Sequence, residues 1–471
     1  MSAAAGTTSR SGLERPGESA TSAISADYCA SLLRDLGRNV QRAQGQKPAP
    51  SPVAEWAASG AMALTGRADG PPVARPAHVA SCMRGALDAL RAMAGNSGLG
   101  HLDGAALLGE RAATAGLRRS GTISAGGSCR LLPTLDGHVA VNLPRADDLR
   151  SLPAWLGEGD TADPWRFVAD ALLQHSTAAA VGRARLLGLA VAEVSDAAPT
   201  DVPWYRVAAE GPARSERDAR APLVLDLSSL WAGPLCTHLL GLVGARVIKI
   251  ESSGRPDGAR GGPPAFFDLM NAGKQSVEID PTTAAGADIL KRLVARADIV
   301  VESARPRALE QLGIDAASIV HDVPGITWVS ITGYGRSGDA AQWIAFGDDA
   351  AAAAGLAGAA GESSDVPLFC ADAVADPLTG VHAAAAALAA RRSGGGRLLD
   401  ISLRDVSAHV LGFAPIDDSP RVHATDDGWQ VVHDDICRPV AAPRARPAAA
   451  RARPLGTDTA AVLDELLGRC S

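Results

Sequence analysis

Short runs of β-branched and aliphatic residues alternate with helical stretches from residue 221 onward, and turn residues bound each run. Such runs are typical of buried strands. The six predicted strands are Leu223–Leu227, Val247–Glu251, Ser276–Ile279, Ile299–Glu302, Ile326–Ile331 and Arg397–Leu403. The predicted helices between them include Gly233–Val243, Ala284–Ala295 and Asp349–Gly358. Because helices separate most strands, we expect an α/β fold with a doubly wound parallel sheet, whose ligands bind beyond the carboxyl ends of the strands.

The N-terminal half follows this alternation less regularly. Pro-rich breaks occur at residues 46–52 and 197–203. Between them, residues 131–143 predict a hairpin that turns at Asp136 and Gly137, and a Trp-containing helical stretch follows to about residue 190. We therefore expect this half to contribute a smaller α+β domain.

Two sets of residues recur along the chain at fixed offsets. At an offset of 207, the matches are Cys29, Leu32, Leu33, Gly37 and Val40 with Cys236, Leu239, Leu240, Gly244 and Val247. At an offset of 295, they are Gly60, Gly66 and Gly85 with Gly355, Gly361 and Gly380. The pattern predicts that residues 24–95 are a shortened duplicate of residues 221–390. Coincidence is the alternative, because the chain contains 50 glycines.

Length, charge and composition narrow the classes of protein. The 471 residues are enough for two or three folding units, and a net charge of −7 argues against a nucleic-acid partner. No apolar stretch approaches the roughly 20 residues that cross a membrane. Residues 1–22 lack the apolar core of a signal peptide, so we expect a disordered tail and a cytoplasmic protein. The cysteines are scattered without metal-ligand spacing, so no metal and no permanently bound cofactor are expected.

A series of motifs in the second half resembles one family. The motifs are residues 225–234, 244–251, 257–260, 271–274, 297–302, 312–315, 376–380 and 396–403. In this order they closely resemble the class III coenzyme A transferases, a group that includes formyl-CoA transferase, carnitine CoA-transferase and α-methylacyl-CoA racemase. The resemblance covers residues 221–413. It implies that the predicted sheet is a Rossmann-like domain that binds a coenzyme A thioester as substrate.

Asp376 matches the nucleophilic aspartate of that family, which lies four residues before a glycine, here Gly380. The resemblance implies that Asp376 attacks the thioester, forms a mixed anhydride and becomes an aspartyl-CoA thioester that hands CoA to a carboxylic acid. A carboxylate can split one difficult acyl exchange into two displacements in this way. The simpler interpretation is that Asp376 caps a helix with Pro377 at its first position, and both roles can hold together.

The resemblance also implies a CoA pocket at the carboxyl edge of the sheet. The matching positions are Ser229, Leu230, Trp231, Ala232, Ile279, Thr282, Ser303, Ala304 and Leu312. Arg260 and Lys274 are candidates for phosphate contacts, with solvated surface charges as the alternative, and core packing is the alternative for Ile279 and Leu312. Trp231 stands where formyl-CoA transferase has a smaller polar residue. Adenine and phosphate contacts are therefore expected to differ from that enzyme.

Two other activities stay open. Racemases of the family share proton transfer between an aspartate and a histidine, whose position here is Phe346, and neither Phe346 nor Gly347 can carry a proton. We therefore expect CoA transfer first. Racemisation or isomerisation of the same thioester is the second reading, and a catalytically inactive CoA- or partner-binding protein is the third.

The N-terminal half carries a glycine loop, Ser124–Ser128, which resembles the loop that opens the family's small domain and covers the active site. Gly126 and Gly127 are the expected lid residues, and Ser81 replaces Asp376 in the first copy. Since family members are interlocked dimers, we expect a fused complementary pair, as an intramolecular pseudo-dimer or a homodimer, that acts on an acyl-CoA and a carboxylic acid. The expected parts are a degenerate first copy (24–205, divided into 24–95 and 120–205), a linker (206–220), a CoA-binding domain (221–413) and a C-terminal tail (414–471).

Overall fold

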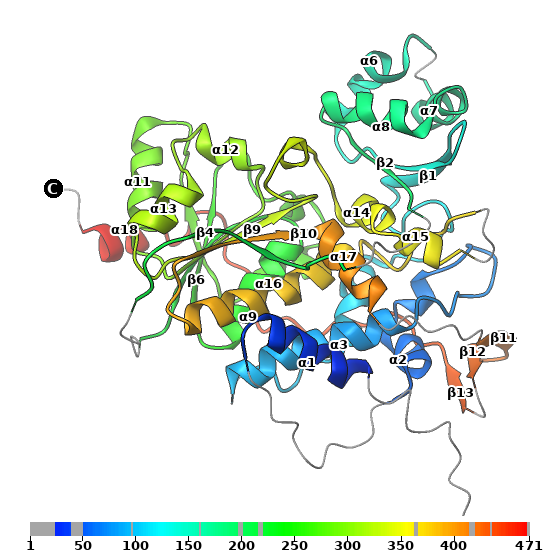
Figure 1. Ribbon diagram of the computed structural model, residues 1–471, viewed down its shortest axis with the longest axis horizontal. Coiled ribbons are helices and arrows are strands. Elements are labelled where there is room, and N and C mark those ends of the chain that lie inside the picture. Colours follow the sequence, from blue (N-terminus) through cyan, green and yellow to red (C-terminus); the bar gives the residue numbers. More distant parts are fainter. Residues whose placement is uncertain are drawn as a thin grey trace, which may run out of the picture.

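The β-branched runs form one seven-stranded sheet in the computed structural model (Figure 1). The structure describes residues 24–38, 50–95, 98–159, 162–195, 201–214, 220–361, 366–413, 420–433 and 436–468. In spatial order the strands are β4 (Arg206–Glu210), β10 (Arg397–Ser402), β9 (Thr327–Thr332), β8 (Ile299–Glu302), β5 (Leu223–Leu227), β6 (Arg246–Glu251) and β7 (Gln275–Glu278). Every neighbouring pair is parallel except β4 with β10, so the predicted doubly wound sheet is confirmed.

Helices cover both faces of the sheet, because successive strand residues point to opposite sides. Val224 belongs to the core on one face, and its neighbours Leu223 and Leu225 belong to the core on the other. The first face carries α9 (Ala232–Leu242) and α16 (Ala375–Arg392), and the second carries α11 (Ala284–Val294), α13 (Ala316–Asp322) and α18 (Thr459–Leu467). The remaining helices of this half are α10 (Pro264–Asn271), α12 (Pro306–Glu310), α14 (Gly347–Ala353), α15 (Leu356–Ala359) and α17 (Leu403–Gly412).

Residues 121–195 form a separate lobe, here called the small domain (Figure 1, top right). Its sheet contains β1 (Cys129–Pro133), β2 (His138–Asn142) and β3 (Ala190–Glu193), and its helices are α5 (Ala146–Arg150), α6 (Leu152–Leu156), α7 (Pro164–Leu172) and α8 (Thr177–Leu186). The predicted hairpin is confirmed, with Pro133 paired to His138 across the turn. The helices bury Trp155 and Val139 in a core of their own, so the smaller α+β domain is present.

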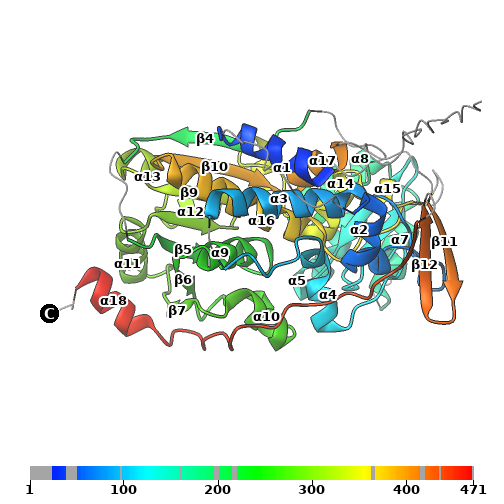
Figure 2. The same ribbon diagram turned by 90° about the horizontal axis from the view of Figure 1, so that it is seen from below.

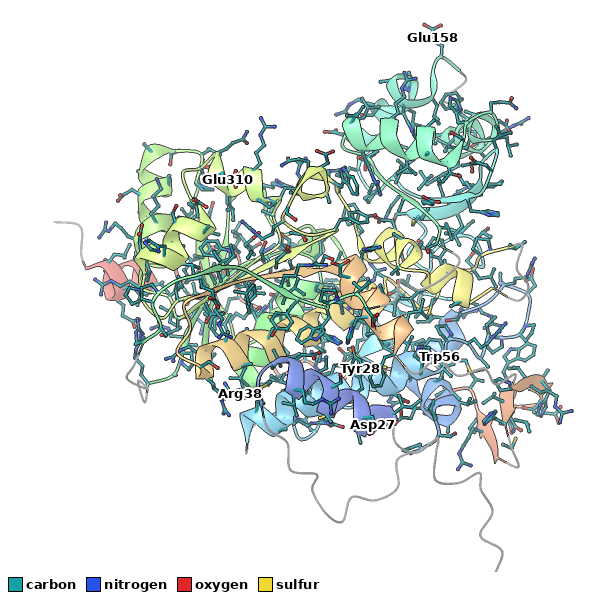
Figure 3. All side chains as sticks on the ribbon, in the orientation of Figure 1. Asp27, Tyr28, Arg38, Trp56, Glu158 and Glu310 are labelled. Atoms are coloured by element: carbon teal, nitrogen blue, oxygen red, sulfur yellow. The ribbon has the colours of Figure 1, made fainter. Side chains whose placement is uncertain are left out.

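The other helices of the N-terminal half pack against the sheet domain. They are α1 (Ile24–Asp35), α2 (Pro52–Ser59), α3 (His78–Ala94) and α4 (Glu110–Ala115), with short 3₁₀ turns at Met62–Leu64 and Ala105–Gly109. The Tyr28 hydroxyl on α1 lies 2.7 Å from Nε2 of His382 on α16. Arg38 donates to the carbonyl of Ala389 at 2.8 Å (Figure 3). One hydrophobic core runs through α1, α3, α9 and α16, so the two halves fold against each other.

Two segments differ from their predicted form. Residues 206–210 were expected to lie in a linker, but they pair with β10 as the edge strand β4. Residues 414–471 were expected to form a tail, but they contain the antiparallel strands β11 (Arg421–Thr425), β12 (Gly428–His433) and β13 (Ile436–Pro439) as well as α18. Asp427 and Gly428 form the turn signal of the β11–β12 hairpin, in which Thr425 pairs with Gly428. The expected tail at 1–22 and Val40 lie outside the described residues.

Between β13 and α18 the chain runs in an extended path beneath both halves (Figure 2). Ala441 donates to the carbonyl of Ala57 at 2.8 Å, and Arg446 forms an ion pair with the buried Glu110. Further along, the backbone of Ala452 donates to Asp268 at 2.8 Å. This segment therefore ties the N-terminal helices to α10 and β7. None of the described helices combines the length and the apolar character that a bilayer crossing requires.

Candidate active site

Asp376 lies in the first turn of α16, at the carboxyl end of the sheet. It accepts a hydrogen bond from the backbone of Ala232, the first residue of α9, so two helix N-termini face its carboxylate. Between residues 367 and 390, every described residue except Asp376 is buried. Val374 is the N-cap of α16, so Asp376 does not cap this helix. Burial raises the pKa of Asp376 to about 7, against the opposing charge of Arg111.

Two further aspartates, Asp348 and Asp372, lie close enough to act on Asp376, and Asp349 lies beside Asp348. Together the four are called the carboxylate cluster. Burial raises the pKa of Asp348 to about 6, with Asp372 adding to the rise, and burial raises the pKa of Asp349 to about 7. Asp349 accepts from the Asn142 amide of the small domain at 2.9 Å. The sequence interpretation missed Asp348 and Asp349 because it searched this position for a histidine.

The backbone before α16 is held in a strained form. Ala371 and Ala373 have φ of 57° and 42°, which alanine seldom adopts. Ala371 donates to the Thr65 hydroxyl at 2.9 Å, and Ala373 donates to Asp348 at 2.9 Å. Asp372 between them is paired with Arg111. Since Thr65 and Arg111 both belong to the N-terminal half, that half holds the segment that leads into Asp376.

The glycine loop lies beside Arg111. Gly126 and Gly127 are exposed, and a Cβ at Gly126 would lie 3.2 Å from the Arg111 guanidinium. The guanidinium also lies over the ring of Trp231, 5.5 Å from its centroid. The structure therefore brings Gly126, Trp231 and Asp376 around one arginine.

The loops after β5 and β8 meet at the same edge. Ser229 donates from its backbone to the Ser303 hydroxyl at 3.1 Å, and both residues are exposed. Leu230 is 40% exposed and has a φ of 68°, a strained form in which its backbone donates to Asp257 at 2.9 Å. Thr282 is exposed, whereas Ala304 and Leu312 are half-buried. These positions can be reached by a ligand, and their role in binding stays a prediction.

Other predicted pocket residues are not accessible. Lys274 is buried, and its amino group bonds Asp226, Thr237, Asn271 and the carbonyl of Pro234. With its hydrogens used inside the protein, Lys274 does not fit the expected phosphate contact. Trp231, at 2% exposed, Ala232 and Ile279 are also buried, so Trp231 supports Arg111 from inside the core.

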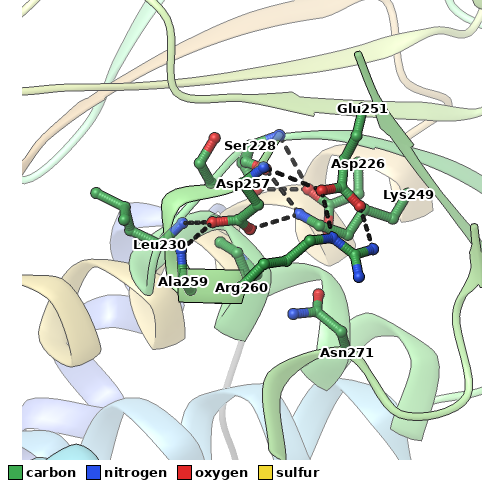
Figure 4. A network of polar contacts seen from close by, with 12 residues as sticks. Asp226, Ser228, Leu230, Lys249, Glu251, Asp257, Ala259, Arg260 and Asn271 are labelled. Carbon is green, nitrogen blue, oxygen red and sulfur yellow. Dashed lines mark hydrogen bonds and ion pairs between the residues drawn. The ribbon is translucent and has the colours of Figure 1, made fainter. Parts of the chain in front are cut away.

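A buried polar network fixes the loop that carries Leu230 (Figure 4). Lys249 pairs with Asp257 at 2.9 Å and donates to the carbonyl of Ser228 at 2.9 Å. Arg260 forms two hydrogen bonds with Glu251, at 2.8 and 2.6 Å, and keeps part of its side chain exposed. Arg260 therefore remains a candidate for phosphate.

A cavity of about 780 Å³ lies away from the carboxylate cluster. Residues of α1, α17 and the 201–207 segment line it, among them Asp35, Trp204, His409 and Phe413. None of the predicted site residues lines this cavity. The chemistry of Asp376, rather than cavity size, therefore places the candidate site.

Comparison with known proteins gives a family match for part of the chain. Residues 222–431 match the family described as CoA-transferase family III, so the resemblance seen in the sequence is confirmed for this part of the chain. Asp376, the strained loop after β5 and every strand of the large sheet except β4 lie within the matched region. Arg111, Thr65, Asn142 and the glycine loop lie outside it.

Two curated relatives are CoA-transferases. The chain is 33% identical over 205 residues to a succinate–glutarate CoA-transferase from Agrobacterium fabrum, covering 40% of this chain and 51% of the relative. It is 32% identical over 193 residues to a formyl-CoA:oxalate CoA-transferase from Escherichia coli, covering 39% and 46%. The chain thus spans about half the length of the curated relatives it matches. A CAIB/BAIF family protein from Brucella suis is 27% identical, with a TM-score of 0.40, covering 47% of this chain and 66% of that structure.

Proposed function

We propose that this protein transfers coenzyme A between an acyl-CoA thioester and a carboxylic acid, with Asp376 as the nucleophile. The observation that carries the proposal is the position of Asp376. It is a half-buried carboxylate in an otherwise fully buried stretch, it faces the N-terminus of α9, and its pKa of about 7 leaves it partly ionised at neutral pH. An ionised carboxylate in that position has the charge and the access that an attack on a thioester requires.

The proposed reaction uses two anhydride intermediates. Asp376 Oδ attacks the thioester carbonyl, a carbon–oxygen bond forms, and the CoA thiolate leaves. The thiolate then attacks the aspartyl carbonyl of the mixed anhydride, which releases the donor acid as a carboxylate and leaves an aspartyl-CoA thioester. The acceptor carboxylate attacks that thioester, and the released thiolate attacks the acceptor's carbonyl. The products are a new acyl-CoA and the regenerated Asp376 carboxylate.

The test is covalent trapping. After incubation with acetyl-CoA, succinyl-CoA or glutaryl-CoA, we expect a hydroxylamine-sensitive adduct on the peptide that contains Asp376, measured by mass spectrometry. Asp376→Ala should remove both the adduct and turnover. Asp315→Ala is the matched control, because Asp315 caps α13 away from the cluster and its loss should cost only about 1 kcal/mol of stability. An adduct that forms equally on the Asp376→Ala protein overturns the assignment.

A second function has one observation in its favour. Asp348, with a pKa near 6, lies close enough to Asp376 to raise that residue's pKa. A second proton carrier, which the sequence did not offer at Phe346, is therefore present for racemisation or isomerisation. Deuterium uptake from D₂O at the α-carbon of a 2-methylacyl-CoA, without transfer to an added acid, would favour this reaction over CoA transfer.

The third reading, a CoA- or partner-binding protein without catalysis, makes a different prediction in the same experiments. Such a protein would bind coenzyme A, measured by calorimetry, yet form no adduct and no exchange product with any of the three thioesters. The partial exposure of Asp376 and the strained backbone at Ala371 and Ala373 favour an enzyme over this reading.

A further inference from the structure

Arg111 is a basic side chain that the N-terminal half places at the carboxylate cluster. It lies on α4 and donates from Nε to Asp372 at 2.9 Å, with a second bond from Nη2 to the other oxygen. Its charge also acts on Asp348 and Asp376. Because Arg111 lies outside residues 222–431, the family pattern assigns it no role.

One edge of this guanidinium remains open. Both bonds to Asp372 use Nε and Nη2, which leaves Nη1 and the second hydrogen of Nη2. The Arg111 side chain is 30% exposed, whereas Asp372 is fully buried. Trp231 supports one face of the group, and Gly126 adds no side chain beside it. A fixed guanidinium with a free edge can receive a carboxylate through charge-assisted hydrogen bonds.

We propose that Arg111 binds the carboxylate of the acid that exchanges with the thioester, a role that rests on the proposed function. The acid arrives as an anion at a site that already holds four aspartates, so repulsion would oppose its entry without a nearby cation. Arg111 offsets this repulsion and holds the incoming carboxylate beside Asp376. The N-terminal half thereby contributes substrate binding as well as cover.

The geometry separates this role from a purely structural one. If Arg111 served only to neutralise Asp372, a fully buried guanidinium would be enough. Instead the group lies beside Gly126, close enough to Asp376 for its charge to act on that carboxylate, and 30% of its side chain is exposed. A substrate-binding role predicts a change in KM for the acid, and a structural role predicts lower stability or a lower kcat.

The test measures exchange between a labelled free acid and its own CoA thioester, with acetate, succinate and glutarate as probes. We expect Arg111→Gln to raise KM for the acid by roughly 10- to 100-fold, with KM for the thioester changed less than about threefold. Arg111→Lys should give an intermediate value, because it keeps the charge and loses the fork. Arg118→Gln is the matched control, because Arg118 is exposed and follows the end of α4. This variant should leave both KM values unchanged.

A second variant guards against misfolding. Arg111→Gln leaves the buried Asp372 carboxylate without its cation, which can unfold the protein. The double variant Arg111→Gln with Asp372→Asn removes both charges and should fold, with a thermal unfolding transition close to that of the wild type. It should show the same raised KM for the acid.

Three outcomes would overturn the role of Arg111, and the first of them would also overturn the proposed function. A wild-type protein that exchanges none of the probes and forms no adduct on Asp376 overturns the proposed function and this role together. Wild-type exchange with an unchanged acid KM in both folded Arg111 variants overturns the role of Arg111 alone. A lower kcat at unchanged KM also overturns it, because it would show that Arg111 only holds the strained segment before α16.

Discussion

Two regions of this molecule show a similar close packing of helices but differ in chemistry. One is α9 with α14–α16 around Asp376, and the other is α1 with α2 and α3 around Ser81. In the second half, a Cβ at Gly380 on α16 would lie 2.7 Å from the carbonyl oxygen of Ala232 on α9. In the first half, a Cβ at Gly85 on α3 would overlap the carbonyl oxygen of Ser25 on α1. These residues are related by the same offsets of 295 and 207, so the close helix crossing supports the proposed duplication.

The similarity extends to the turns and to the covering sheets. Gly60 after α2 and Gly355 after α14 have φ of 83° and 95°, both left-handed. The small domain packs beside α14 through β2 and β3, and the β11–β13 sheet packs beside α2 through β12 and β13 (Figure 1). Each region is therefore covered by an antiparallel sheet of three strands.

The difference lies in what fills the equivalent position. Ser81 is 1% exposed and donates to Glu55, which is also paired with Arg84. Ser81 and Glu55 are therefore both buried, and Arg84 neutralises the carboxylate from the edge of this set. Asp376 is accessible and lies beside an arginine with an open edge. The comparison teaches that similar helix packing can hold either a buried serine or a partly exposed carboxylate, depending on what the other half places beside it.

Removing the first region should have the largest effect. A fragment of residues 214–471 keeps Asp376 but loses α1, α3, Thr65 and Arg111, so it exposes the apolar face of α16. We expect it to be poorly soluble and, where soluble, inactive in the exchange assay. Co-expression with residues 1–213 is the control and should restore solubility. A soluble, fully active fragment would show that the N-terminal half is an independent appendage.

Alanine substitutions at Asp376 and Ser81 should affect activity in one region and stability in the other. Asp376→Ala is expected to lower exchange roughly a thousandfold or more, because the nucleophile is lost. Ser81→Ala should keep activity within about twofold and cost about 1–3 kcal/mol of stability, because Glu55 loses a buried partner. Chemical denaturation and the exchange assay measure the two effects. Equal losses of activity in both variants would refute the distinction.

An added methyl group should destabilise both helix crossings to a similar extent. Gly85→Ala and Gly380→Ala each force a methyl group into backbone atoms of the facing helix, and we expect losses of about 1–3 kcal/mol of stability. Gly182→Ala on α8 is the control, because a Cβ there meets no atom within 4 Å, and it should stabilise slightly. Thermal unfolding reports all three. A stabilised Gly85→Ala protein would remove the strongest structural support for the duplication.

The smallest expected effect is that of pH. Since burial raises the pKa of Asp376 to about 7 and the ionised form is the nucleophile, kcat/KM should fall as pH falls below 7, approaching about tenfold per unit. The profile belongs to the whole cluster, because Asp348 and Asp349 titrate in the same range, near Arg111 and Cys129. Ser81→Ala should leave it unchanged. Activity that is flat or rising between pH 7 and 5.5 contradicts the ionised nucleophile.

The sequence by itself determined the sheet and the candidate nucleophile. β-Branched runs predicted β5 and β8 at their observed bounds and the other predicted strands within a few residues, because strand formation follows the local pattern of side chains. The order of motifs within residues 221–413 singled out Asp376 in the same way. Local signals also placed the hairpin of the small domain.

Only the tertiary structure decided which residues surround Asp376. Arg111, Thr65 and Asn142 lie more than 200 positions away along the chain, in stretches with no motif, and they reach the cluster because α3 packs on α16 and the small domain packs on α14. Lys274 and Trp231, which the pattern alone predicted as ligand contacts, are buried in the folded chain. Periodicity reports which face of an element is apolar, but long-range packing decides what that face meets and which charges stay open to a substrate.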